Sequence, residues 1–174
     1  MKDTILVIVI LVLCLVAWGC PPKPTEPERP KLTPEEAAEA RRTIVEWLEC
    51  EECTDGELEA VVKLGEVAVP NLSAALREGP SQASVELLRR HLVKTYGDLK
   101  EYEKTHPEAR VTSSEEEYVS TYMENYDALY RVRAATALGA IGGTEAKKAL
   151  EGAMKEPFRD DVETAVADAL GKIR

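Results

Sequence analysis

The chain has 174 residues, a mass of 19.2 kDa and a formal net charge of −10. This length fits one domain, and the acidic balance disfavours a nucleic-acid or polybasic membrane-surface binder, both of which need clustered Lys and Arg. Aromatic residues make up only 5% of the chain, so the core has to be built from Ala, Leu, Val and Ile, which favours closely packed helices.

The N-terminus carries an apolar run from Ile5 to Val16 that continues to Cys20. The run is shorter than the roughly 20 residues of a membrane-spanning helix, and Lys2 precedes it, so residues 1–19 are predicted to be a secretory signal peptide. The sequence from Ala17 to Cys20 also resembles a bacterial lipobox. That resemblance implies lipidation of Cys20 and a membrane-anchored envelope protein facing the periplasm or the exterior. A plain cleaved signal and a short uncleaved anchor are the alternatives.

Residues 20–32 follow as a proline-rich segment that holds five of the ten prolines of the chain. Proline lacks the backbone N–H that helices and central strands need, so the segment is predicted to be an extended tether. At ~3.1 Å per residue it reaches roughly 30–35 Å, far enough to hold a folded domain clear of a lipid surface.

The first half of the body, which spans residues 33–174, contains clear helix boundaries. Residues 33–36 and 54–57 each place Thr three residues before Glu, the pattern of a capping box that opens a helix. The first of these helices is predicted to end near Glu49. Pro70 suits the first turn of a third helix, which Gly79 and Pro80 then stop.

A fourth helix is predicted from Ser81, and residues 103–113 lack periodicity and are predicted to be a loop. A third capping box at 114–117 opens a helix that runs to Ile141, with a possible break near residues 125–127. Two further helices carry the apolar positions 146–154 and 162–173. No segment alternates with period two, so the chain is predicted to be all-α.

An internal repeat is visible in the second half of the body. The four residues from Leu138 to Ile141 recur 32 residues later from Leu170 to Ile173, and a related group stands at Leu64 to Val67. The segment 131–143 resembles the short bacterial HEAT-like repeat, and 65–76 is similar to a further copy; the match is weak over 81–128. The resemblance implies an α-solenoid of about four helical hairpins.

Two groups of side chains are candidates for a site. Cys50 and Cys53 are predicted to form a structural disulfide, since an exported chain meets an oxidising compartment; redox catalysis and metal binding by the pair are the alternatives. His91 and His106 are the only histidines, and neither has ligand-like spacing, so no metal or cofactor is expected. On the next helix, tyrosines recur every four residues and could form either core or a binding face: Tyr118, Tyr122, Tyr126 and Tyr130.

The charged residues do not add a catalytic set. Arg131 and Arg133 stand where HEAT-like repeats often carry Arg, so intramolecular pairing is expected rather than anion capture. No nucleophile has an identifiable base. The sequence therefore predicts a lipid-anchored, non-enzymatic interaction scaffold or assembly adaptor with an unidentified protein partner and no nucleic acid. The alternative is a small redox or metal-dependent enzyme that uses Cys50 and Cys53.

Overall fold

The computed structural model describes residues 32–173. The predicted signal peptide at 1–19, the lipidation candidate Cys20 and the tether up to residue 31 lie outside the described residues.

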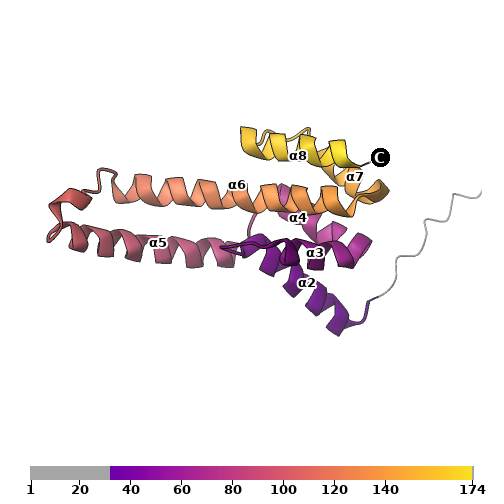
Figure 1. The fold of residues 1–174 in the computed structure, drawn as a ribbon, viewed down its shortest axis with the longest axis horizontal. Coiled ribbons are helices and arrows are strands. Elements are labelled where there is room, and N and C mark those ends of the chain that lie inside the picture. Colours follow the sequence, from indigo (N-terminus) through magenta and orange to yellow (C-terminus); the bar gives the residue numbers. More distant parts are fainter. Residues whose placement is uncertain (1–31, 174) are drawn as a thin grey trace, which may run out of the picture. The chain divides into compact units, whose positions relative to one another are not determined.

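Within residues 32–173 the chain forms seven α-helices and two short 3-10 helices and no strand, which confirms the all-α prediction for that part. In chain order they are α2 (Pro34–Glu49), α3 (Asp55–Leu64), η1 (Gly65–Val67), α4 (Val69–Glu78), α5 (Gln82–Glu103), η2 (Pro107–Ala109), α6 (Glu115–Ile141), α7 (Gly143–Ala153) and α8 (Asp160–Lys172). Figure 1 shows α5 and α6 as the two long elements.

The three predicted capping boxes all form. At the start of α2 the Thr33 hydroxyl accepts a hydrogen bond from the Glu36 amide at 3.3 Å, and the Glu36 carboxylate accepts one from the Thr33 amide at 2.8 Å. Equivalent boxes open α3 at Thr54 and α6 at Ser114. Each box satisfies amide donors that the first turn of a helix leaves without a partner, and this explains why these boundaries are readable from sequence.

The predicted break in α6 is wrong, because α6 is one helix of 27 residues. The segment 125–127 contains no Gly or Pro, and its side chains make contacts four residues further along. The Tyr126 and Tyr130 rings lie 6.1 Å apart, and Asp127 accepts a hydrogen bond from Arg131 at 2.7 Å. The predicted loop at 103–113 is largely irregular, with η2 inside it.

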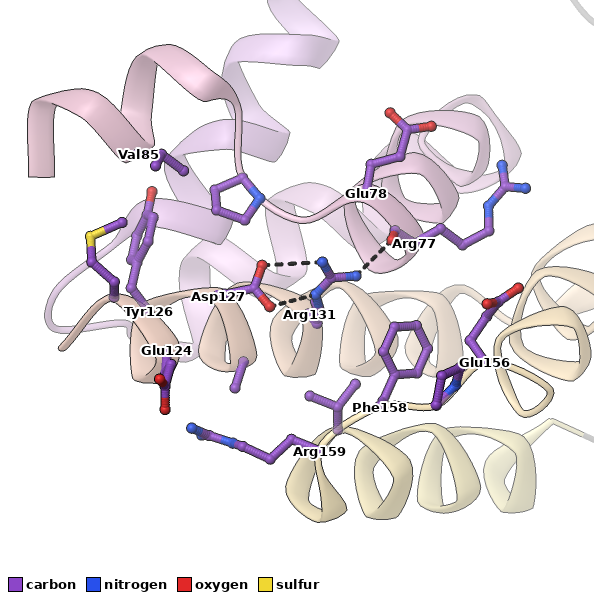
Figure 2. A pocket seen from close by; sticks show the side chains of 15 residues that line it. Arg77, Glu78, Val85, Glu124, Tyr126, Asp127, Arg131, Glu156, Phe158 and Arg159 are labelled. Carbon is purple, nitrogen blue, oxygen red and sulfur yellow. Dashed lines mark hydrogen bonds and ion pairs between the residues drawn. The ribbon is translucent and has the colours of Figure 1, made fainter. Parts of the chain in front are cut away.

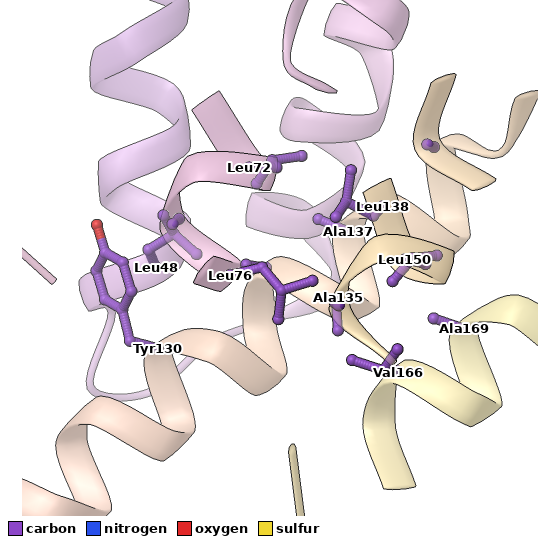
Figure 3. Packing of buried hydrophobic residues seen from close by; sticks show 14 of the residues in the cluster. Leu48, Leu72, Leu76, Tyr130, Ala135, Ala137, Leu138, Leu150, Val166 and Ala169 are labelled. Carbon is purple, nitrogen blue, oxygen red and sulfur yellow. The ribbon is translucent and has the colours of Figure 1, made fainter. Parts of the chain in front are cut away.

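The hydrophobic core lies where α2, α3, α4, α7 and α8 surround the C-terminal part of α6, and we call this region the base. Figure 3 shows leucines from α4, α6 and α7 meeting over the alanines of α6. Gly139 marks a close approach of α6 to α8, because a Cβ atom built there would lie 2.7 Å from the Cβ of Ala169 on α8. The small residues thus let α6 and α8 pack almost backbone to backbone.

The three Leu-Gly motifs of the repeat are not equivalent in structure. Gly139 and Gly171 lie inside the last turns of α6 and α8, whereas Gly65 follows the end of α3 with φ 57°. A positive φ is a conformation that glycine adopts without strain, so Gly65 ends a helix and Gly139 allows close packing. The two roles share one sequence pattern.

The remaining part of the fold is a helical hairpin that we call the arm, residues 82–125. It consists of α5 and the N-terminal part of α6, which run side by side away from the base (Figure 1). Leu92 and Val119 are its only buried residues. Tyr96 reinforces the arm, because its ring lies 5.5 Å from that of Tyr118 and its hydroxyl donates to the carbonyl of Ser113 at 2.9 Å.

Candidate interaction groove

A groove of about 720 Å³ lies where the arm joins the base, and we call it the arm groove. Its walls come from the start of α5, the middle of α6 and the corner between α2 and α3. Three large apolar side chains line it and are open to solvent: Leu87 is 64% exposed, Tyr122 50% and Leu129 46%. Exposed apolar side chains that gather in one hollow are typical of a binding surface, whereas scattered ones need no explanation.

The tyrosine series of α6 passes from the core to this groove. Tyr130 is buried in the base, Tyr126 and Tyr118 are half-buried, and Tyr122 is exposed. The Tyr118 and Tyr122 rings lie 4.6 Å apart. Tyr130 therefore belongs to the core, whereas Tyr122 and Tyr126 line the groove, because α6 leaves the base partway along its length.

A polar cluster closes the inner end of the groove and joins three helices. The Glu49 carboxylate at the end of α2 accepts hydrogen bonds from the hydroxyl of Ser84 on α5, at 2.7 Å, and from the hydroxyl of Tyr126 on α6, at 3.3 Å. Burial and the neighbouring Glu49 charge raise the pKa of Tyr126 to about 12. The hydroxyl therefore stays protonated and available as a donor at neutral pH.

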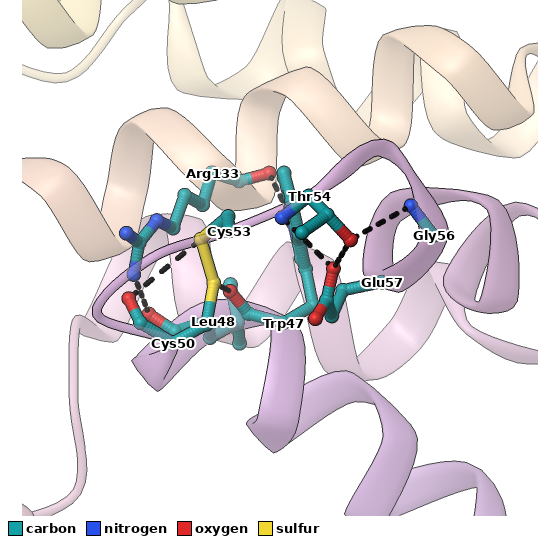
Figure 4. The surroundings of a disulfide bond; sticks show 8 residues. All are labelled: Trp47, Leu48, Cys50, Cys53, Thr54, Gly56, Glu57 and Arg133. Atoms are coloured by element: carbon teal, nitrogen blue, oxygen red, sulfur yellow. Dashed lines mark hydrogen bonds between the residues drawn. A yellow bond between two sulfur atoms is a disulfide. The ribbon is translucent and has the colours of Figure 1, made fainter.

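Trp47 and Arg133 hold α2 against α6 just behind this cluster (Figure 4). The Trp47 indole N–H donates to the carbonyl oxygen of Arg133 at 3.1 Å, and the Arg133 guanidinium donates to the carbonyl oxygen of Leu48 at 3.0 Å. Burial lowers the pKa of Arg133. A helix ends in carbonyl groups without partners, so a cation placed there stabilises the end of α2.

One member of the cysteine pair, Cys50, lies at the rim of the groove. Cys50 and Cys53 lie at disulfide-bonding distance in the loop between α2 and α3, with Cα atoms 5.5 Å apart (Figure 4). Cys50 lines the groove, and so does the exposed carboxylate-bearing residue Glu51. The pair thus fixes the direction in which the chain leaves α2, and it brings an acidic turn to the edge of an apolar hollow.

A second hollow of about 700 Å³ lies between α4, α6 and α8, and an intramolecular network lines it (Figure 2). Arg131 forms an ion pair with Asp127 at 2.7 Å and donates to the carbonyl oxygens of Leu76 at 2.8 Å and Arg77 at 2.7 Å. Its guanidinium also lies 5.3 Å from the ring centroid of Phe158. Arg131 and Arg133 therefore pair within the chain, as predicted, and both bind the end of a helix.

The histidines and the loop at 103–113 do not converge on one site. His91 lines the arm groove, whereas His106 stacks on Tyr102 with ring centroids 3.9 Å apart near the tip of the arm. The loop contributes no lining residue to the groove. Among residues 32–173 no group of three His, Cys, Asp or Glu is placed to hold a metal ion.

Several groove residues were not identified from the sequence. Leu87 and Leu129 fall outside the apolar stripes that mark the inner faces of α5 and α6, and an apolar residue on an otherwise polar helix face was the available signal. Glu49 and Ser84 carry no such signal, because their contacts depend on how α2 meets the arm. None of the helices described in residues 32–173 is long and apolar enough to cross a membrane.

Comparisons of this chain with protein-family models, curated proteins and solved structures give no match. The role of the groove therefore has to be inferred from its own geometry and chemistry.

Proposed function

We propose that this chain is an exported, lipid-anchored protein of the cell envelope that serves as an interaction scaffold or assembly adaptor, and that the arm groove is its binding surface. The observation that carries this proposal is the gathering of Leu87, Tyr122 and Leu129, all exposed, in one hollow. Covering apolar surface gains roughly 25 cal/mol per Å², and aromatic anchors in a pocket dominate many protein interfaces.

The shape and charge of the groove favour a protein segment over a small ligand. It is open along two helices, and two acidic residues line it beside the apolar side chains: Glu49 at its inner end and Glu51 on the rim there. A partner segment with an apolar stripe and basic residues beside it complements this arrangement. The charged rim contributes orientation and association rate more than affinity.

Export and anchoring are supported by the sequence. The apolar run before Cys20 and the proline-rich tether after it support a lipidated N-terminus. A disulfide between Cys50 and Cys53 is compatible with an oxidising compartment outside the cytosol. In this proposal the tether lets the folded body reach a partner roughly 30–35 Å from the membrane.

We also propose that the base is a short HEAT-like solenoid with the arm as an expanded unit. Two features support this: α3–α4 and α7–α8 are pairs of short consecutive helices, and small residues such as Gly139 and Ala169 bring neighbouring helices close together. Stacked hairpins of this kind bury one face on each neighbour. The sequence resembles the repeat only weakly over 81–128, and this is where α5 and α6 are longer than the helices of the other pairs.

Crosslinking in intact cells, followed by affinity purification and mass spectrometry, tests the proposed function. We expect one dominant crosslinked protein with the wild-type chain, and its loss with Leu129→Glu, which places a charge in the apolar wall. Val93→Glu is the matched control, because Val93 is 41% exposed on α5 outside the groove. Cys20→Ala reports whether the anchor matters. A partner profile that is the same for wild type and Leu129→Glu would contradict the proposal.

A further inference from the structure

The arm has too little core for a hairpin of its length. Its two helices bury only Leu92 and Val119, whereas the base buries more than twenty apolar residues. Isolated helices draw most of their stability from packing an apolar face, and two helices alone bury little of it. A further helical layer over the arm groove would supply the missing burial.

The exposed face of the arm has the spacing of a helix-packing seam. Tyr122 and Leu129 are seven residues apart on α6, and Leu87 and Lys94 are seven residues apart on α5, so each pair lies on one side of its helix. The seam is apolar where the arm meets the base and becomes basic about 10 Å further out, at Lys94. At the opposite, inner end the groove is acidic, because Glu49 at the end of α2 and Glu51 in the turn that follows both line it.

This arrangement is complementary to itself. Suppose that a second copy of the arm lies antiparallel across the groove, with the two-fold axis near Tyr122. The exposed apolar side chains around Tyr122 in the two copies would then face each other. The same two-fold rotation would place Lys94 of the second copy beside Glu51 of the first. By symmetry, Lys94 of the first copy would lie beside Glu51 of the second. Within the single chain Lys94 forms an exposed ion pair with Asp98, four residues further along, at 2.5 Å. Exposed ion pairs contribute little stability, so Lys94 can change its partner at little cost in free energy.

We propose that the occupant of the arm groove is the arm of a second copy of this chain, in an isologous antiparallel dimer. This inference rests on the proposed function, because it names the partner of the same groove. The dimer completes a four-helix layer from two thin hairpins. As a scaffold it carries two anchors and two bases, related by two-fold symmetry.

Sedimentation velocity of the full-length chain in mild detergent, over a range of protein concentrations, tests the proposal. The expected result is a concentration-dependent dimer that Leu129→Glu converts to monomer and that Val93→Glu leaves intact. Any association through residues 1–31 is common to all variants, so the difference between the two substitutions reports the groove alone. Circular dichroism melting shows whether Leu129→Glu still folds.

A charge exchange tests the antiparallel arrangement. Glu51→Lys and Lys94→Glu should each raise the dimer dissociation constant about tenfold, because each affects two symmetry-related pairs. The double variant should return to within about threefold of the wild type. Additive weakening in the double variant would overturn the proposed arrangement.

The remaining outcomes separate this inference from the proposed function. A chain that stays monomeric, while a different protein is captured in cells in a Leu129-dependent manner, overturns the dimer and leaves the proposed function standing. A dimer that Leu129→Glu does not disturb overturns the dimer inference, because association then uses another surface; the proposed function is then decided by whether crosslinking in cells depends on Leu129.

Discussion

The base and the arm bury apolar surface to very different extents. In the base, α6 lies among five other helices, and Leu76, Leu138 and Leu150 are fully buried. The arm is a single hairpin in which two large side chains, Tyr102 and Tyr122, remain about half exposed. The two parts of α6 therefore have different roles: the C-terminal part packs in the core of the base, and the middle part lines the groove.

The largest expected effect is the difference between equal truncations in the two regions. Leu76→Ala, in the base, should lower the free energy of unfolding by about 3 kcal/mol, because it leaves a cavity among fully buried neighbours. Leu87→Ala, in the groove, should change it by less than about 0.5 kcal/mol. Urea unfolding of both variants measures the two values. Equal losses in the free energy of unfolding would contradict the different roles of base and groove.

Gly139→Ala should be nearly as damaging to the base. The new Cβ would lie 2.7 Å from the Cβ and 2.8 Å from the Cα of Ala169, so α8 has to move. We expect a loss of about 2 kcal/mol, within the range for overpacked sites. Gly97→Ala on α5 is the matched control, since a Cβ there meets nothing within 4 Å. The control should be neutral or stabilising.

The disulfide sits at the joint between base and arm, and removing it should have a moderate effect. Cys50→Ser together with Cys53→Ser should lower the free energy of unfolding by about 2 kcal/mol or less, because a short loop loses little entropy on closure. Dithiothreitol should reproduce this shift in the wild type and leave the double variant unchanged. Intact mass under non-reducing conditions that shows two free thiols would contradict the bond.

Arg131→Gln tests the other joint, where α4 ends against α6. The substitution removes the donors to the Leu76 and Arg77 carbonyls and the ion pair with Asp127, so we expect a loss of about 1.5 kcal/mol. Arg159→Gln serves as the control, because its pair with Asp161 is exposed. Thermal unfolding should show a clearly lower melting temperature for Arg131→Gln than for Arg159→Gln. Similar small shifts would argue against a role of Arg131 in capping the end of α4.

The smallest effect concerns the hydroxyl of Tyr126 at the inner end of the groove. Its pKa is raised to about 12, so the folded state holds this proton more tightly than the unfolded state does. The resulting stabilisation is fully present below the ordinary tyrosine pKa of about 10, and it is lost as pH rises to about 12. Absorbance titration of the wild type against Tyr126→Phe should show one tyrosine fewer in the high-pH phase.

Much of the fold could be predicted from sequence because its signals are local. The capping residues Thr33, Thr54 and Ser114 mark helix starts within four residues, and Gly79 marks an end. The continuity of α6 was missed because tyrosine and aspartate near 125–127 have moderate helix propensity, and contacts with Tyr130 and Arg131 decide the outcome.

The candidate site was only partly predictable. The tyrosine series and the cysteine pair are visible as spacing patterns, and both reach the groove. Which tyrosine is exposed depends on where α6 leaves the base, and the exposure of Leu87 and Leu129 depends on how α5 and α6 align. Both are properties of packing between segments distant in sequence. An apolar residue on a polar helix face is a local sign of Leu87 and Leu129, but it does not show that the two share one hollow.

The most direct test of the central claim is photo-crosslinking from the groove in intact cells. A photoreactive phenylalanine replaces Tyr122 in one strain and Ser120 in another; both positions are exposed, and Ser120 lies on the opposite side of α6. The account predicts a discrete crosslinked protein from position 122 and none from position 120. Equal crosslinking from both positions, or none from position 122, would contradict the arm groove as the binding surface.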